Sequence, residues 1–153
     1  MTSAMSLGVA EMSTTNHGTI STEQDLRLVG PDDIIVPLTA DLRYSRQDPY
    51  AIRMSLDTGL EEPVVWALDR DLLTAALHAP EGIGDVRLWP SVTPGGDKLL
   101  NIELGPPSGY ARFEASAAEI GAFLARTYEL VPAGQESACL DIDAELTELL
   151  KQA

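Results

Sequence analysis

The chain has 153 residues, and its 24 acidic side chains outnumber its 10 Lys and Arg to give a formal net charge of -14. Its 44% hydrophobic residues are typical of one globular domain with its own core, and the negative charge opposes binding to phosphate backbones and anionic lipid. A lone cysteine, Cys139, excludes an internal disulfide and favours a reducing compartment, so we expect a cytoplasmic protein.

The composition of residues 1–18 predicts a disordered N-terminal extension. This stretch contains no Lys or Arg and no continuous apolar run, so it lacks the pattern of a secretory signal peptide. Its Ser, Thr and Gly content offers little apolar surface to bury. We therefore expect a single domain over residues 19–153. No window approaches the roughly 18 apolar residues of a membrane span, so we expect no membrane insertion.

Alternation of period two predicts four strands in the first half of the chain. The first places Ile20, Leu26 and Leu28 on one face. The apolar parity of the next two strands predicts inward side chains at Ile34, Val36, Leu38, Ala40, Leu42 and Tyr44, and then at Tyr50, Ile52, Met54 and Leu56. Pro37 has no N–H for a sheet ladder, which indicates a sheet edge or a bulge. A fourth strand follows at residues 64–68, where the parity of Trp66 favours the core.

A short helix is predicted after Asp69, whose carboxylate can cap it, and Pro80 and Gly82 prevent its continuation. Its apolar stripe consists of Leu72, Leu73, Ala76 and Leu77. Three further strands are expected at residues 85–91, 99–104 and 110–115, separated by turns rich in Gly and Pro. We interpret residues 82–85 as a turn, because they precede a strand and lack the third glycine or the lysine of a phosphate-binding loop.

Two helices complete the predicted order. Ser116 and Glu119 have the spacing of a capping box, and the stripe that follows is Ile120, Phe123, Leu124 and Thr127. A final amphipathic helix is predicted from Ile142, Leu146, Leu149 and Leu150. The order is therefore four strands, a helix, three strands and two helices, and its short turns favour antiparallel neighbours. We predict an α+β fold with a twisted antiparallel sheet of about seven strands.

No residue pattern predicts catalysis, a cofactor site or a metal site. Cys139 has no histidine nearby in sequence, and the only histidines are His17 and His78. Asp141 and Asp143 are better explained as helix caps than as metal ligands. A small-molecule enzyme and a binder of single-stranded nucleic acid both stay open as alternatives, although the ten basic residues form no cluster in the sequence.

Several short sequence motifs carry a family resemblance. They are DLRLV at residues 25–29, LRY at 42–44, DPYA at 48–51, VW at 65–66, RDLL at 70–73, GDVRLWP at 84–90, RT at 126–127 and VPAG at 131–134. From Thr19 to Lys151, in order and spacing, the chain resembles the SsgA-like family of actinobacterial sporulation and cell-division proteins. The resemblance is nearest to the member that recruits the tubulin-like GTPase FtsZ.

This resemblance implies a non-enzymatic protein that recruits FtsZ to sporulation septa and is itself guided by an SsgA-like paralogue. It further implies a homotrimer whose subunit is similar to the whirly fold, which binds single-stranded nucleic acid. The charge of -14 argues that this chain has not kept the nucleic-acid activity of that fold.

Five residues are predicted to contact partners. Pro132 stops a helix, and Gly134 can adopt the positive φ that aims the chain after it, so both are predicted to direct the C-terminal helices toward a partner. Trp89 has a parity opposite to Val86 and Leu88, which favours a second layer or a subunit contact. Arg53 and Arg87 are expected at exposed strand positions.

Overall fold

The structure, a computed structural model, describes residues 18–57, 62–105, 111–139 and 149–150. Its strands are β1 (Thr19–Val29), β2 (Ile35–Ser45), β3 (Asp48–Leu56), β4 (Val64–Asp69), β5 (Glu81–Ile83), β6 (Val86–Val92), β7 (Lys98–Leu104) and β8 (Ala111–Ser116). Its helices are α2 (Arg70–Ala76) and α3 (Ala117–Leu130), with the short 3-10 turn η1 (Pro31–Asp33). The predicted extension, 1–18, lies outside the described residues except for Gly18, whose carbonyl accepts a hydrogen bond from Arg46 N at 2.8 Å.

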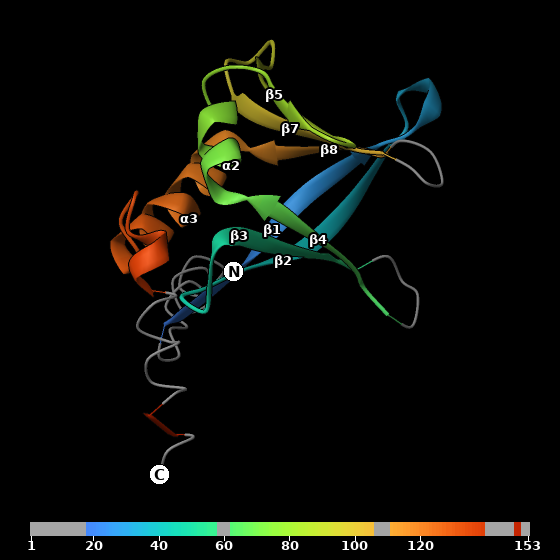
Figure 1. Cartoon of the computed structure of the whole chain (residues 1–153). Coiled ribbons are helices and arrows are strands. Elements are labelled where there is room, and N and C mark those ends of the chain that lie inside the picture. The colour runs from blue at the N-terminus through green and yellow to red at the C-terminus, as the bar shows by residue number, and fades with distance from the viewer. Residues whose placement is uncertain (1–17, 58–61, 106–110, 140–148, 151–153) are drawn as a thin grey trace, which may run out of the picture.

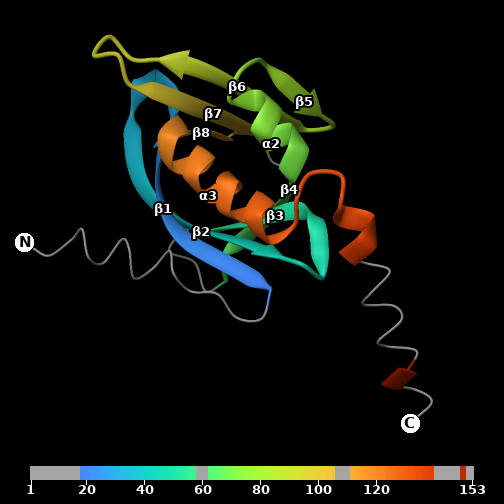
Figure 2. The same cartoon turned by 90° about the vertical axis from the view of Figure 1, so that its left-hand side faces the viewer.

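All eight strands form one antiparallel sheet in the order β4-β3-β2-β1-β8-β7-β6-β5. Each half of the chain contributes four consecutive strands, and α2 connects the halves. The β1–β8 pairing joins them through residues 26–29 and 112–115. Figures 1 and 2 show the sheet curled into a half-barrel, with α2 and α3 on its concave side. The predicted antiparallel α+β class is confirmed.

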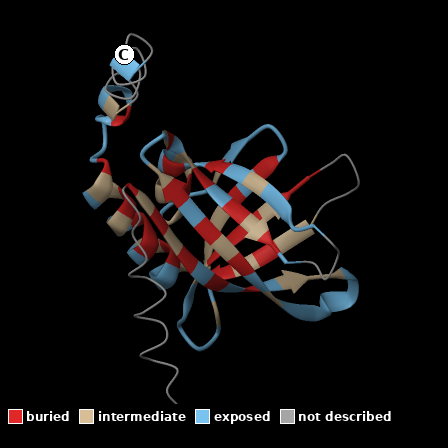
Figure 3. Cartoon of the chain, turned by 90° about the horizontal axis from the view of Figure 1, so that it is seen from below, coloured by how far each residue is buried: buried red, intermediate tan, exposed pale blue. Residues whose placement is uncertain are grey.

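Period-two burial follows from side chains that alternate between the two faces of a strand. In β1, Ile20, Thr22, Gln24 and Leu26 are buried, whereas the residues between them are exposed or half-buried. Figure 3 shows the resulting alternation of buried and exposed positions along the strands. Trp66 is half-buried against the core, as its parity predicted.

The number of strands differs from the prediction. Residues 81–83, left out of the predicted strands, form β5, which pairs with β6 through Glu81↔Leu88 and Ile83↔Val86. Gly84 sits in the turn between them at φ +57°. A strand of three residues is too short to show alternation, so only its hairpin partner reveals it. The predicted last helix at residues 142–150 lies largely outside the described residues.

The inward positions predicted for β2 and β3 are only partly right. Ile34 and Val36 are 60% and 42% exposed, because β3 begins to pair with β2 only at Ala40 and the start of β2 projects beyond it. Pro37 lies in the part of β2 that has no hydrogen-bonded neighbour in β3, which agrees with the sheet edge predicted there. Tyr50 is 46% exposed, since the register shifts by three residues between Arg43↔Arg53 and Ser45↔Asp48, and a shift by an odd number turns the following side chains to the other face.

Both described helices begin at the positions predicted from their capping residues. The Asp69 carboxylate accepts a hydrogen bond from Leu72 N at 2.8 Å, and the Ser116 hydroxyl accepts one from Glu119 N at 3.2 Å. The predicted stripe of α3 is buried: Ile120, Phe123, Leu124 and Thr127. On the stripe of α2, Leu73 and Ala76 are buried, while Leu72 and Leu77 are partly buried against the core. Helix α3 packs on β1, β7 and β8, whereas α2 contacts β3, β4, β5 and β6.

Candidate functional site

The predicted junction after α3 is an exposed turn that follows a buried residue. Val131 is fully buried, and its N–H donates to Thr127 O at 2.9 Å, which ends the helix. Pro132 and Gly134 are both exposed, and Gln135 N donates to Pro132 O at 3.0 Å across the turn. Gly134 has φ +84°, so the positive φ that this position was expected to need is present. A Cβ there would meet no atom within 4 Å, so a substitution would strain the backbone without a steric clash.

The other three predicted contact residues lie on the convex face of the sheet. Arg53 alternates with the buried Ile52 and Met54 of β3, and Arg87 and Trp89 alternate with Val86 and Leu88 of β6. Trp89 is half-buried, while both arginines are exposed. Strands β2, β1, β8 and β7 separate β3 from β6, so Arg53 and Trp89 stand on the order of 24 Å apart along the sheet. The five predicted residues therefore do not form one continuous surface.

Several arginines of this convex face contact carboxylates. Glu114 accepts from Arg27 Nη2 at 2.6 Å and from Arg112 Nη1 at 3.2 Å. Arg112 Nη1 also donates to Asn101 Oδ1 at 3.0 Å. Farther along the sheet, Arg53 pairs with Asp48 at 3.0 Å. These cations are already partnered within the sheet, so each would have to exchange a carboxylate for any external anion.

The centre of the junction is Arg70, a residue to which the sequence reasoning assigned no role. It is the first residue of α2, and its side chain is only 1% exposed. Its Nη1 donates to Thr127 O at 3.0 Å and to Val131 O at 2.7 Å, so it caps the last carbonyls of α3. Its Nη2 donates to a carboxylate oxygen of Glu136 at 2.8 Å. One buried guanidinium thus holds both sides of the turn that contains Gly134.

Two aromatic rings enclose this guanidinium. Its central carbon lies 4.9 Å from the ring centroid of Tyr44 on β2 and 4.0 Å from that of Tyr128 on α3, which are distances of cation–π contacts. The Tyr44 hydroxyl donates to Pro49 O at 2.9 Å, and the Tyr128 hydroxyl donates to Asp71 at 2.7 Å. The arginine therefore connects β2, α2 and α3 with the segment after α3.

Burial and charge shift the acidities around Arg70. Burial raises the pKa of Tyr44 to about 12, against the opposing pull of the Arg70 charge, and burial also raises the pKa of Tyr128. The hydrogen bond from Arg70 holds the pKa of Glu136 below its ordinary value. Glu136 is thus ionised at neutral pH, and its charge compensates that of the buried arginine.

A sequence signal for this site existed in the position of the arginine. A cation in the first turn of a helix is unfavourable to the helix dipole, so a basic residue directly after the Asp69 cap needs a separate explanation. The structure supplies it, because the Arg70 side chain leaves its own helix and caps the C-terminal end of α3. Which carbonyls would receive it could not be read from local sequence.

The described residues contain neither a cluster of metal-binding side chains nor a membrane-spanning helix. In residues 18–57, 62–105, 111–139 and 149–150, no group of three or more His, Cys, Asp or Glu side chains is arranged to hold a metal ion. Within the same ranges, no helix has the length and apolar character to span a membrane.

Comparisons with known proteins connect this structure with sporulation. The family model "Streptomyces sporulation and cell division protein, SsgA" matches residues 38–136, a segment that contains every residue described around Arg70. The sporulation-specific cell division protein SsgB of Thermobifida fusca is 52% identical over 131 residues, which cover 86% of this chain and 94% of that protein. SsgB of Streptomyces coelicolor is 44% identical over 135 residues, covering 88% and 98% of the two chains.

Solved structures agree with the sequence comparisons. The SsgA-like sporulation-specific cell division protein of Thermobifida fusca superposes with a TM-score of 0.80 at 50% identity, covering 88% of this chain and 98% of that one. A structure of Streptomyces coelicolor SsgB, a protein whose mutations correlate with longitudinal cell division during sporulation, gives a TM-score of 0.75 at 42% identity, covering 82% and 99%. On both sequence and fold, the chain belongs to the SsgA family of sporulation and cell-division proteins.

Proposed function

We propose that this protein acts without catalysis in sporulation-specific cell division, by recruiting the tubulin-like GTPase FtsZ to division sites. The observation that carries the proposal is the similarity to SsgB proteins along most of the chain, since those relatives are sporulation-specific cell division proteins. In this proposal the protein works in the cytoplasm at the division septum and is positioned by an SsgA-like paralogue.

The turn at Gly134 is the part of the molecule that we assign to partner recruitment. It is exposed, and Arg70 anchors it on both sides through Val131 and Glu136. Such an anchor holds an exposed turn in one orientation, which lowers the entropy cost of binding a partner there. The turn also sets the direction in which residues 135–139 leave α3.

The proposal includes assembly into a homotrimer. Ile34, Ile35 and Val36 are 60%, 43% and 42% exposed. Ile34 directly precedes β2, and Ile35 and Val36 begin the strand, where it pairs with β1 but not with β3. Consecutive exposed apolar residues beside an unpaired strand edge favour association with another chain. Three copies related by a closed symmetry would cover this edge on every subunit.

The recruitment test compares two glycine substitutions with similar backbone strain. Gly134→Val places a β-branched residue at φ +84°, and the control Gly84→Val places one at φ +57° in the β5–β6 turn. Neither new Cβ meets an atom within 4 Å, so each costs on the order of 1–3 kcal/mol of strain without a clash. We expect Gly134→Val to lower co-sedimentation with FtsZ filaments and septal fluorescence, and Gly84→Val to leave both near the wild-type level.

Circular dichroism and light scattering must first show that both variants are folded and keep the wild-type mass. Full recruitment by a folded Gly134→Val protein would remove the turn from the mechanism. Absence of co-sedimentation for the wild-type protein, with its paralogue present, would contradict recruitment of FtsZ itself.

A further inference from the structure

A large groove opens where β1 and β8 diverge. These strands pair only through residues 26–29 and 112–115, because β8 ends at Ser116 and the chain continues as α3. The groove has a volume of about 1580 Å³ and lies between β1–β2 on one side and the β6–β7 turn on the other. Ordinary small-molecule pockets measure roughly 300–1,000 Å³, so its size favours a segment of a macromolecule.

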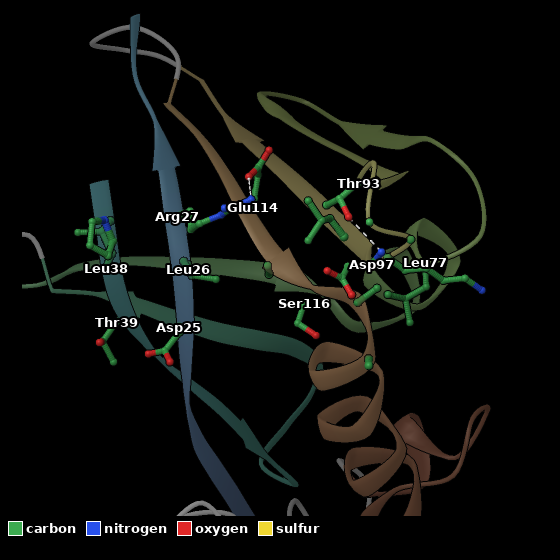
Figure 4. A pocket seen from close by; sticks show the side chains of 18 of the residues that line it. Asp25, Leu26, Arg27, Leu38, Thr39, Leu77, Thr93, Asp97, Glu114 and Ser116 are labelled. Atoms are coloured by element: carbon green, nitrogen blue, oxygen red, sulfur yellow. Dashed lines mark hydrogen bonds and ion pairs between the residues drawn. The ribbon is translucent and has the colours of Figure 1, made fainter. Parts of the chain in front are cut away.

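The groove combines an apolar lining with carboxylates on opposite walls. Leu26 and Ala115 are buried in its lining, and Leu38, Leu77 and Leu99 are half-buried around them. In Figure 4, Asp25 stands beside Thr39 on the β1–β2 wall, and Asp97 stands near Thr93 and Leu77 on the other. Both carboxylates thus belong to the lining of one groove, which has apolar side chains between its walls.

The lining of the groove is negatively charged overall, although Lys98 is an exposed cation within it. Its lining holds four carboxylates, Asp25, Asp57, Asp97 and Glu114, and two cationic side chains, Arg27 and Lys98, besides His78. Arg27 and Glu114 form an ion pair at 2.6 Å, so they neutralise each other. The side chains of Asp25 and Asp97 are exposed and have no ion-pair or hydrogen-bond partner among the residues that the structure describes. They are thus available to a cationic ligand.

We infer that this groove binds a cationic, amphipathic helical segment of a partner protein. Apolar side chains of the segment contact Leu26, Leu38, Leu77 and Leu99, and its Lys or Arg residues reach Asp25 and Asp97 on the two walls. The negative charge of the groove and of the whole chain opposes a nucleic acid or an anionic lipid surface as its ligand. This inference goes beyond the proposed function, because the partner need not be FtsZ.

Synthetic peptides provide a direct test with the full-length protein. The first probe is a helical peptide of about 14 residues with Leu along one face and Lys along the other. The second has the same composition in a scrambled order without an apolar stripe, so its charge is identical. Binding is measured by fluorescence anisotropy and located by amide chemical shifts. We expect only the amphipathic peptide to bind, with shifts concentrated at the groove residues.

Paired substitutions identify the carboxylates that matter. Asp25→Asn with Asp97→Asn should raise the Kd of the amphipathic peptide about fivefold to tenfold, as expected for the loss of two exposed ion pairs. The control pair, Glu62→Gln with Asp85→Asn, removes the same charge at exposed positions outside the groove and should change Kd by less than about twofold. Circular dichroism verifies the fold of both proteins.

Four outcomes would overturn the inference. Equal binding of the two peptides, or an equal loss in the two variant proteins, would mean attraction to overall charge without a specific groove. Chemical shifts confined to another surface would place the peptide elsewhere. A changed oligomeric mass in the Asp25→Asn, Asp97→Asn protein, with unchanged peptide binding, would assign the groove to contacts between copies of this chain.

Discussion

At the scale of single residues, Arg70 determines how the chain leaves α3. A guanidinium that is 1% exposed requires an anion and several acceptors, since an unpaired buried charge costs several kcal/mol. Glu136 supplies the anion, Thr127 and Val131 supply carbonyls, and Tyr44 and Tyr128 cover the two faces. These partners come from three separate segments, β2, α3 and the residues after α3, so changing one of them affects the position of all the others.

Replacing Glu136 by Gln tests this account. The substitution leaves Arg70 buried without its counter-charge, and we expect the free energy of unfolding near pH 7 to fall by about 3 kcal/mol. The hydrogen bond from Arg70 lowers the pKa of Glu136 below 4.5, so the stabilisation is present above that pH and is lost as the pH falls through the lowered value. The difference in free energy of unfolding between wild type and Glu136→Gln, measured with urea, should therefore narrow as the pH is lowered below 4.5.

Glu129→Gln provides the control, because Glu129 is exposed on α3. Its free energy of unfolding should stay within about 0.5 kcal/mol of the wild-type value. A Glu136→Gln protein as stable as wild type near pH 7, or a difference that does not change with acid, would contradict the role given to the Arg70–Glu136 pair.

At the scale of elements, the caps decide where each helix begins and therefore what its first residues can reach. Asp69 ends β4 and caps α2, so Arg70 follows directly at the first helical position. From there its side chain reaches the C-terminal end of α3, which packs on the same side of the sheet (Figure 2). A helix that began one turn later would point this arginine elsewhere.

Substitution of Asp69 removes the helix cap and leaves Arg70 unchanged. Asp69→Ala deletes the acceptor of the hydrogen bond from Leu72 N, and we expect a loss of about 1 kcal/mol in urea unfolding. Asp69→Asn keeps a side-chain oxygen acceptor and should retain most of the stability. An Asn variant as unstable as the Ala variant would show that the charge, and not the cap, is what matters at this position.

At the scale of the whole molecule, the half-barrel leaves some strand edges without neighbours. The start of β2 projects beyond β3 and exposes Ile34, Ile35 and Val36, and this edge is the surface that we assign to subunit association. The convex face carries arginines that contact carboxylates, which supports the expectation that the protein does not bind single-stranded nucleic acid tightly. That expectation stays a prediction.

Light scattering after size exclusion tests the assembly. We expect a mass about three times the 16.4 kDa of one chain at micromolar concentration. Ile34→Lys with Val36→Lys should shift the mass toward the monomer, because charges on an unpaired edge oppose association. The control Ile83→Lys changes an apolar side chain that is 65% exposed on β5 and should keep the wild-type mass. A monomeric wild-type protein would contradict the proposed trimer.

Local sequence determined much of this protein. Alternation and turn residues together located seven of the eight strands, and the caps at Asp69 and Ser116 correctly placed the starts of α2 and α3. These features depend on residues close together in the chain, whose backbone and side-chain geometry repeats in any fold. The positive φ of Gly134 was expected for the same reason, because a glycine in a short turn adopts it without the strain of a Cβ.

Tertiary structure alone decided which predicted inward side chains are exposed, where the groove lies and what surrounds Arg70. The exposure of Ile34 and Val36 depends on where β3 stops pairing, and that of Tyr50 depends on a register shift against β2. The groove exists because β8 ends where α3 begins, leaving β1 without a partner on that side. The environment of Arg70 joins residues separated by up to 66 positions. Such contacts arise from the packing of distant segments, which no local pattern in the sequence encodes.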